Sequence, residues 1–324
     1  MRCLLITTVK DEGPSILEWI AHHKRIGFDD IVVYQNDSTD MMPRTLATLD
    51  QMGVIRYFDN SSKRVKGGWQ PIAYTRASKL PLHSEADWAI ALDGDEYLSI
   101  NTPEGTVQSL IEAVCNEAPV EPDVIRLNWK IFGSGFHRRL SPDLVTSRYT
   151  KTEWNDRIST NIVGFKTLYR TSVFTRPGVH NPSWAVRDDW VEANGSGLPL
   201  DAYRNAGWRS TDPGLRRFAQ VNHYMVRSAS DYLVKCARGR SSNTQKTIRL
   251  RYWRNANMND DTDTALADQA DDLAARMAAL DEQSGGKLMR FRARSFQMHR
   301  KQVRAALDDP EWRALYDKMI GVIA

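Results

Sequence analysis

Residues 87–98 read DWAIALDGDEYL, an apolar run that ends abruptly in three carboxylates. The run at 88–92 has the composition of a strand that is buried on both faces of a sheet. Asp93, Asp95 and Glu96 follow it at once, and burying their charges without partners would be costly. We therefore expect these carboxylates at the tip of a buried strand, where they face a cleft.

Oxygen ligands in this position suit a hard divalent cation. Mn²⁺ and Mg²⁺ prefer carboxylate oxygens, and proteins commonly supply one or two of them while phosphate oxygens and water complete the shell. Gly94 lets the backbone turn tightly between the two aspartates. A solvated turn is the alternative for an isolated Asp-x-Asp motif, and the apolar run before it favours the metal site.

Upstream of this run, apolar stretches alternate with helical patterns, as is typical of a parallel sheet covered by crossover helices. The predicted strands are 3–9, 30–35, 54–58 and 88–92. The predicted helices are 15–26, 43–52 and 72–84, the last with a break at Pro81. We expect an α/β fold, with a Rossmann-like, mostly parallel central sheet flanked by helices.

Polar loops leave the predicted strands at 7–13, 36–40 and 93–97. Because sheets of this kind bind ligands at the carboxyl ends of their strands, we expect these three loops to converge. Farther along, the sequence predicts a strand at 129–132, a loop at 195–214 and helices from residue 230 onward. Asp309 followed by Pro310 is a typical helix start.

Composition narrows the class of protein. The chain has 324 residues, 41% of them hydrophobic, and a formal net charge of +4, which does not require nucleic acid as a partner. Its three cysteines lie far apart without a CxxC pair, which argues against a zinc knuckle or a disulfide framework. No run approaches the roughly 20 apolar residues of a membrane helix. We expect a cytoplasmic protein and leave peripheral contact with the inner membrane face open; the sequence does not indicate the oligomeric state.

Five motifs then occur in order along the chain. They are KDEG at 10–13 with LEWIAHH at 17–23, YQNDSTD at 34–40, DGDE at 93–96, FGSG at 132–135, and NHY at 222–224 leading to Lys235 and Arg238. Together they resemble a bacterial glycosyltransferase family 2 group related to family 92. The resemblance runs from residue 3 to about 255. It implies a GT-A fold, a nucleotide-diphosphate sugar donor such as a UDP-sugar, Mn²⁺ or Mg²⁺, a glycan or other hydroxyl acceptor, and inversion at the anomeric carbon.

The resemblance also implies roles for individual residues. The nucleotide and diphosphate would be bound by Thr8, Lys10, Glu12, Asp37, Asp93, Lys235 and Arg238. The metal would be held by Asp93, Asp95 and His223, although a hydrogen-bonded core histidine is the alternative for His223. His180, in a His-x-Pro element, would contact donor or acceptor. The chain has Asp11 where relatives often have asparagine, and Gly94 where many have a bulkier residue.

An inverting transfer needs a base that takes the proton from the acceptor hydroxyl. The resemblance implies a base between the acidic segment and His223, where Asp188 and Asp189 lie. Adjacent residues of a strand point to opposite faces, so at most one of them can face the cleft; Asp189 is the predicted base and Asp188 the alternative. Glu153 and Asp156 compete, and an exposed acidic turn is the other interpretation of the aspartate pair. Trp184 would give an acceptor sugar a stacking surface, as would Trp190 and Trp208; core packing is the commoner fate of tryptophan.

We predict a GT-A domain at 1–255, with a nucleotide-binding half at 1–100 and an acceptor-side half at 101–255, followed by a helical extension at 256–324. Polysaccharide biosynthesis is the expected process. Two alternatives stay open. A nucleotidyltransferase acting on sugar phosphates would also use carboxylates and a metal, but a glycine-rich phosphate loop is missing. A non-catalytic protein could bind an anionic surface through the basic C-terminal segment.

Overall fold

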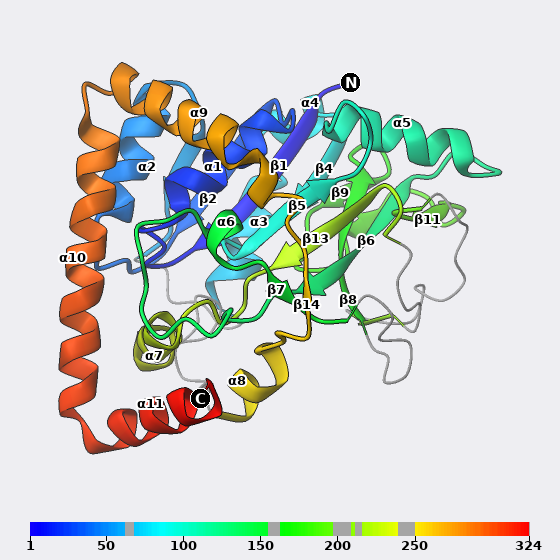
Figure 1. Cartoon of the computed structure of the whole chain (residues 1–324). Helices are drawn as coiled ribbons and strands as arrows, with labels where there is room; N and C mark the ends of the chain where they lie inside the picture. Colours follow the sequence, from blue (N-terminus) through cyan, green and yellow to red (C-terminus); the bar gives the residue numbers. More distant parts are fainter. Residues whose placement is uncertain (62–67, 155–162, 197–208, 211–215, 239–249, 324) are drawn as a thin grey trace.

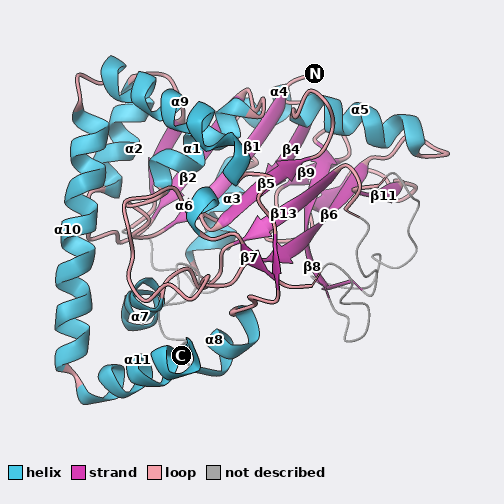
Figure 2. Cartoon of the chain, in the orientation of Figure 1, coloured by secondary structure: helices cyan, strands magenta, loops and turns pink. Residues whose placement is uncertain are grey.

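The computed structural model describes residues 1–61, 68–154, 163–196, 209–210, 216–238 and 250–323. In these residues ten strands form one curled sheet, in the order β3-β2-β1-β4-β8-β6-β13-β5, with β11 beside β6 and β12 beside β8 (Figure 1). Helices cover the sheet, as Figure 2 shows. The α/β class predicted from the sequence is confirmed.

The first half of the sheet is parallel. It consists of β1 (Cys3–Val9), β2 (Asp30–Gln35), β3 (Arg56–Asp59) and β4 (Trp88–Ala91). Leu5 belongs to one apolar cluster, while Leu4 and Ile6 belong to another on the opposite face. Because both faces of β1 are buried, its sequence is continuously apolar, and this explains why the strand was predictable.

The second half of the sheet is mixed, so the prediction of a mostly parallel sheet holds only for the first half. It consists of β5 (Glu96–Ile100), β6 (Val124–Ile131), β8 (Val163–Arg170), β11 (Glu192–Asn194), β12 (Arg209–Ser210) and β13 (Ala219–His223). β8 runs antiparallel between β4 and β6, and β13 runs parallel to β6 but antiparallel to β5. Two-stranded pairs form outside this sheet, between β9 (Phe174–Arg176) and β10 (Ser183–Ala185) and between β7 (Lys151–Thr152) and β14 (Asp261–Thr262).

The three predicted N-terminal helices are present, and the structure adds a helix at 107–117 that the sequence did not predict. They are α1 (Ile16–Arg25), α2 (Met42–Gln51), α3 (Trp69–Ala77), α4 (Pro81–Glu85) and α5 (Val107–Glu117). A proline cannot continue a helix because it lacks the N–H and its ring clashes with the preceding turn. The break predicted at Pro81 is confirmed, because α4 begins there.

Helices dominate the C-terminal part, as predicted. They are α6 (Val145–Arg148), α7 (Ala229–Arg238), α8 (Leu250–Ala256), the 3₁₀ turn Ala267–Gln269, α9 (Ala270–Gln283), α10 (Lys287–Asp308) and α11 (Pro310–Ile323). The Glu311 N–H donates to Asp309 Oδ1 at 2.8 Å, which confirms the predicted cap. Leu273 of α9 and Leu288 of α10 join the same apolar cluster as Trp19 of α1. None of the helices in the described residues combines the length and apolarity needed to cross a bilayer.

Candidate active site

The loops after β1, β2 and β4 converge, which confirms the prediction. The carboxylate of Asp11 accepts from the N–H of Thr39 at 2.6 Å, and the Gly13 N–H donates to Asp40 at 2.7 Å. Arg227 then joins the first loop to the third, because it donates to Glu12 Oε2 at 2.9 Å and to the Gly94 carbonyl at 3.4 Å. One edge of the sheet therefore gathers the three polar loops.

Gly94 lets the acidic turn, residues 93–96, lie directly against β1. A Cβ atom at this position would be 2.9 Å from Val9 Cγ1 and 3.4 Å from Glu12 Cγ. Since carbon atoms do not approach so closely, a side chain here would push the turn away from the loop after β1. The absence of a Cβ keeps the carboxylates of the turn next to that loop.

Asp93 and Glu96 share a lysine that the sequence analysis missed. Lys166 of β8 is fully buried, and its Nζ lies 2.9 Å from Asp93 Oδ2 and 3.1 Å from Glu96 Oε2. Gln70 of α3 donates to the other oxygen of Asp93 at 3.0 Å. Burial opposes the charge on Lys166, yet the two carboxylates outweigh it and raise the pKa of the lysine. The pair of acids is thus compensated by one buried cation.

Asp95 faces His223 and Lys235. Its Oδ1 lies 3.5 Å from His223 Nε2, and its Oδ2 lies 2.7 Å from Lys235 Nζ. His223 is brought there by the pairing of β13 with β5, in which it stands opposite Glu96. Burial alone would raise the pKa of Asp95, but Lys235 and His223 hold it well below its ordinary value. Asp95 is therefore a carboxylate that stays charged beside a histidine nitrogen.

Asp95 and His223 fit a divalent cation as two neighbouring ligands. Ligands that each lie about 2.1 Å from one ion are separated by at most about 4.2 Å, and a separation of 3.5 Å is within this limit. The prediction also included Asp93, but both of its oxygens bind Gln70 and Lys166 instead. In the described residues no group of three or more His, Cys, Asp or Glu side chains could hold a metal. Phosphate oxygens and water would have to supply the other positions.

Lys235 and Arg238 lie on one face of α7, as their spacing predicts. Lys235 also donates to the Met225 carbonyl at 2.9 Å. Arg238 donates to Glu12 Oε1 at 2.9 Å and to the Asp11 carbonyl at 2.7 Å, and it also binds the Lys10 carbonyl. Both cations therefore reach the polar loops. They meet carboxylates and carbonyls there, and Glu12 lies between two arginines.

Thr8, Lys10 and Asp37 lie at the predicted edge of the sheet. Thr8 is the second-last residue of β1 and is buried, and Lys10, just beyond the strand, is half-buried. Asp37 follows β2 and is exposed; its backbone has a φ of +49°, and its N–H donates to Ser61 Oγ at 2.8 Å. Their roles toward a nucleotide stay predictions.

His180 lies near the acidic turn and contacts Trp129 of β6, a residue that the sequence did not indicate as part of the site. The His180 and Trp129 rings are 5.4 Å apart, and the Trp129 ring lies 4.5 Å from the His223 ring. His180 Nδ1 is 3.0 Å from the Phe165 carbonyl. Burial, with the nearby Lys166 charge, lowers the pKa of His180 to about 4, so it is neutral at physiological pH. The Trp129 ring packs flat on Gly164, where a Cβ would lie 2.0 Å from Cε3.

The three tryptophans that were predicted to stack on an acceptor sugar differ in their surroundings. Trp184 of β10 is 56% exposed, and the Arg176 guanidinium lies 5.2 Å from its ring centre. Trp190 packs against Phe174, with ring centres 5.4 Å apart. Trp208 and the competing base Asp156 lie outside the described residues. Trp184 is thus the tryptophan of this set with a free face.

The structure contradicts the general base that the sequence predicted. Asp188 and Asp189 lie in no strand, and the Asp189 side chain is 82% exposed and pairs with Arg187 at 2.8 Å. Arg187 also pairs with Asp123, directly before β6, at the edge of the sheet that holds the amino end of β4. The acidic turn follows the carboxyl end of β4. Asp189 is therefore linked to the end of β4 opposite the acidic turn.

Glu153 lies at the correct edge. Its Oε1 accepts from the Ile131 N–H at 3.2 Å and from Arg216 Nη2 at 3.0 Å. Ile131 is the last residue of β6 and stands opposite His223 of β13. Of the carboxylates considered as the base, Glu153 is the one that the structure brings to the strand end occupied by His223.

Lys166 was not predicted as a site residue, but its place in the sequence indicates that it is buried with a partner. Lys166 is the one charge inside the apolar strand VGFKTL at 163–168. A lysine is almost never fully buried without a partner, so a strand lysine points to a buried carboxylate. The partner itself could not be inferred, because Asp93 lies 73 residues away and meets Lys166 only through the pairing of β4 with β8.

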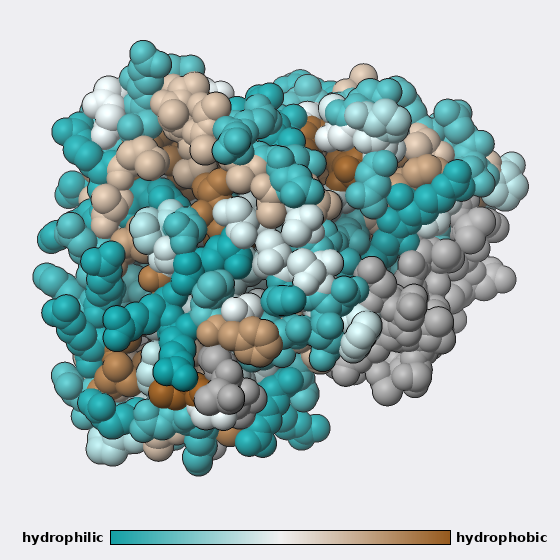
Figure 3. All heavy atoms as spheres, in the orientation of Figure 1, coloured by the Kyte–Doolittle hydropathy of each residue, from teal (hydrophilic) through white to brown (hydrophobic). Residues whose placement is uncertain are grey.

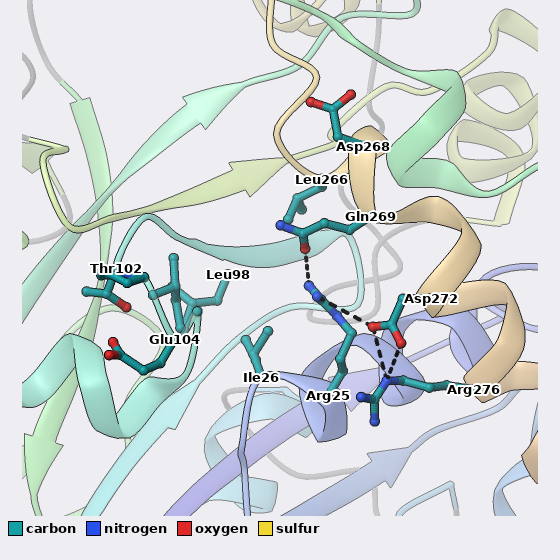
Figure 4. A pocket seen from close by; sticks show the side chains of 13 residues that line it. Arg25, Ile26, Leu98, Thr102, Glu104, Leu266, Asp268, Gln269, Asp272 and Arg276 are labelled. Carbon is teal, nitrogen blue, oxygen red and sulfur yellow. Dashed lines mark hydrogen bonds and ion pairs between the residues drawn. The ribbon is translucent and has the colours of Figure 1, made fainter.

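A cavity of about 510 Å³ lies away from this cluster (Figure 4). It is lined at the far end of β5 by Leu98 and Ile100, whereas the acidic turn precedes the other end. Figure 4 shows Arg25 reaching toward Asp272, and Arg276 pairs with the same carboxylate at 3.2 Å. None of the predicted site residues lines this cavity, so it is separate from the candidate active site.

Comparison with solved structures found several similar proteins. A structure of S. aureus TarS in complex with UDP is 16% identical with a TM-score of 0.33, over 53% of this chain and 48% of that chain. Another S. aureus TarS structure is 13% identical with a TM-score of 0.37, over 87% and 43%. Glucosyl-3-phosphoglycerate synthase from Mycobacterium tuberculosis, solved with Mn²⁺, UDP and glucosyl-3-phosphoglycerate, is 14% identical with a TM-score of 0.27, over 40% and 44%. This chain spans less than half the length of each.

A search among curated proteins gave no match. The sequence model of glycosyltransferase family 92, by contrast, matches residues 8–263, which is well over half of the chain and contains the three loops, the acidic turn and His223. The chain therefore belongs to glycosyltransferase family 92.

Proposed function

We propose that this chain transfers a sugar from a nucleotide-diphosphate sugar, most simply a UDP-sugar, to a hydroxyl group of a glycan or similar acceptor, with a divalent cation and inversion at the anomeric carbon. The observation that carries the proposal is the pairing of Asp95 with His223, 3.5 Å apart, at the edge of the sheet where the three polar loops meet. Membership of family 92 supports the reaction class.

Charge supports the diphosphate side of the proposal. Asp95 and His223 would hold Mn²⁺ or Mg²⁺, which neutralises the negative charge that develops on the departing diphosphate. Lys235, 2.7 Å from Asp95, would hold a phosphate oxygen next to the ion. Arg238 binds the carbonyls of the loop after β1 and would keep that loop, with Thr8 and Lys10, shaped for the nucleotide.

Geometry also supports a role for the neutral His180 and for Trp129. The Trp129 ring contacts both the His180 ring and the His223 ring, and neither Trp129 nor the neutral His180 adds a charge beside His223. A sugar ring can pack against such a surface while its hydroxyl groups bind the polar neighbours. We propose Glu153 as the base that takes the proton from the acceptor hydroxyl, because it reaches the strand end beside His223.

Thermal unfolding with nucleotide and metal tests the proposal. UDP with Mn²⁺ at 100 times its Kd should stabilise the folded chain by about 2.7 kcal/mol and raise Tm by several degrees. Asp95→Asn should abolish the Mn²⁺-dependent part of this rise while UDP alone still gives a small one. Asp189→Asn, at the opposite edge of the sheet, is the matched control and should keep the full rise.

Product analysis separates the proposal from nucleotidyl transfer. Release of UDP from a UDP-sugar on addition of Mn²⁺ supports sugar transfer. Release of pyrophosphate from a nucleoside triphosphate and a sugar phosphate, or a Tm that no nucleotide and metal pair changes, would contradict it.

A further inference from the structure

Helix α10 presents a row of cations to solvent. Residues 287, 290, 294, 297, 301 and 304 follow one another at spacings of three and four, which places them on one face of a helix. All but Gln297 are lysine or arginine, and all six residues are exposed. Of the eleven exposed residues of α10, six are cations and one, Asp308, is an anion. We call Lys287, Arg290, Arg294, Lys301 and Arg304 the basic row.

Within the described residues, carboxylates do not compensate the charges of the basic row. In the described part of the chain, none of its five cations lies within 4.0 Å of a carboxylate, whereas buried Arg292 and His299 on the opposite face bind the body of the protein. Arg290 donates to the carbonyl of Gly286, directly before α10, and Arg294 donates to Gln297 within α10. Ordinary surface helices mix both signs of charge, so this face is distinctive.

The position of α10 makes this face accessible. In Figure 1 α10 runs along one edge of the molecule, with α9 and α11 turning away at its ends. Figure 3 shows hydrophilic side chains along that edge. The helix has 22 residues and is therefore about 33 Å long. Met289, 40% exposed, adds one apolar side chain near the start of the row.

The opposite face of α10 contacts the loops of the candidate active site. Gln302 donates to Thr39 Oγ1 at 3.3 Å, and Arg292 donates to the Pro14 carbonyl at 3.0 Å. His299 lies 3.4 Å from Asp231 of α7, the helix that carries Lys235 and Arg238. A surface that bound the basic row would lie one helix diameter, about 10 Å, from these loops.

We propose that the basic row is a docking surface for an anionic lipid bilayer. A straight row of flexible cations on an outer helix matches a planar sheet of phosphate headgroups, and each such cation strengthens binding to it. Nucleic acid fits less well, because the exposed face of α10 has no aromatic side chain for stacking and Gln297, its single amide, is bound to Arg294. The docking does not depend on the proposed transfer reaction.

Vesicle co-sedimentation tests the proposal. The full chain should bind vesicles of equal parts phosphatidylcholine and phosphatidylglycerol, should not bind pure phosphatidylcholine, and should be released by salt. The triple variant Arg290→Glu, Arg294→Glu, Lys301→Glu should bind about 100-fold more weakly. The control triple variant Arg56→Glu, Lys79→Glu, Arg254→Glu changes the net charge equally at exposed positions elsewhere and should lose less than about threefold.

Folding of the variants is checked by far-UV circular dichroism and Tm, which should match the unmodified chain. Equal losses in the two triple variants would overturn the proposal in favour of a net-charge effect. Failure of the unmodified chain to bind anionic vesicles would also overturn it. Binding of duplex DNA that exceeds vesicle binding and disappears in the first triple variant would assign the row to nucleic acid instead.

Discussion

Lys166 lies fully buried beneath the acidic turn, and its single charge meets two carboxylates. Its third contact, at 3.0 Å, is with the Val179 carbonyl, next to His180. The side chain thus joins β8 to the turn and to the segment that holds His180. Burial raises the pKa of Glu96, and the positive charge of Lys166 acts against this rise. The charged form of Glu96 therefore depends on Lys166.

Lys166→Met should therefore lower the free energy of unfolding by about 3–5 kcal/mol, because it leaves buried carboxylates uncompensated. Lys79→Met, at an exposed position, removes the same charge and should change stability by less than about 0.5 kcal/mol. Urea unfolding at neutral pH measures both. Equal midpoints for Lys166→Met and the unmodified chain would show that the ion pairs contribute nothing.

The proposed base gives a second comparison of single residues. Glu153→Gln should lower kcat by about 10²–10⁴-fold with little change in KM, since the amide cannot accept the proton. Asp189→Asn should leave kcat unchanged. Steady-state assay of nucleotide release measures both, and the reverse pattern would return the role to Asp189.

At the level of single residues, the sequence predicted the members of the site better than their partners. Asp93 and Asp95 stand out because carboxylates end an apolar run, and His223 stands out because it resembles the late histidine of many GT-A enzymes. That Asp93 binds Lys166 while Asp95 faces His223 depends on strand pairings between distant segments. Asp189 was chosen for its place along the chain between the acidic turn and His223, and chain order does not determine at which edge of the sheet a residue lies.

Helix α7 connects the site to the C-terminal helices through Asp231. Its carboxylate lies 3.4 Å from His299 of α10 and 3.8 Å from Arg227. Burial alone would raise the pKa of Asp231, but the nearby His299 ring and the charge of Arg227 lower it to about 2. An acid with a depressed pKa in the folded state stabilises the fold above its unfolded pKa, near 4, and loses this contribution as the pH falls toward 2.

Asp231→Asn should accordingly lower the free energy of unfolding by about 2 kcal/mol near pH 7. The difference between the two proteins should shrink between about pH 4 and pH 2, where the unmodified carboxylate becomes protonated. Chemical denaturation across this range measures it. A difference that does not vary with pH would attribute the effect to packing instead of charge.

At the level of elements, strands and helices of the first half were predictable to within about three residues. Strands buried on both faces have continuous apolar sequences, and the helices have marked ends such as Pro81 and Gly27. The second half was less predictable, because β5 is only five residues long and β8 and β13 carry buried polar side chains such as Lys166 and Asn222. Their order in the sheet arises from antiparallel pairings that no local pattern specifies.

In the whole molecule, α9 and α10 are part of the main core. Leu273, Met277 and Leu288 are buried in the cluster that contains Trp19 and Leu5. The predicted boundary at residue 255 therefore separates segments that share one core, and the family match ends nearby, at residue 263. The helical extension stabilises the sheet that carries the site.

Leu288 and Met289, adjacent residues of α10 with side chains of similar size, test whether α10 belongs to the core. Leu288 is fully buried, so Leu288→Ala should lower the free energy of unfolding by about 2–4 kcal/mol, through lost burial and the cavity that remains. Met289 is 40% exposed, and Met289→Ala should change it by less than about 0.5 kcal/mol. Urea unfolding distinguishes them. Similar small effects would indicate that α10 is detachable from the body.

The pairing of β13 with β5 sets the separation of Asp95 and His223, since His223 stands opposite Glu96 in the backbone ladder. The connections that lead into and out of β8, between β6 and β13, are not part of that ladder. Evolution can therefore lengthen, shorten or rewrite those connections while Asp95 and His223 stay in register. In the proposed reaction, a change of acceptor would then leave the proposed donor site unaltered.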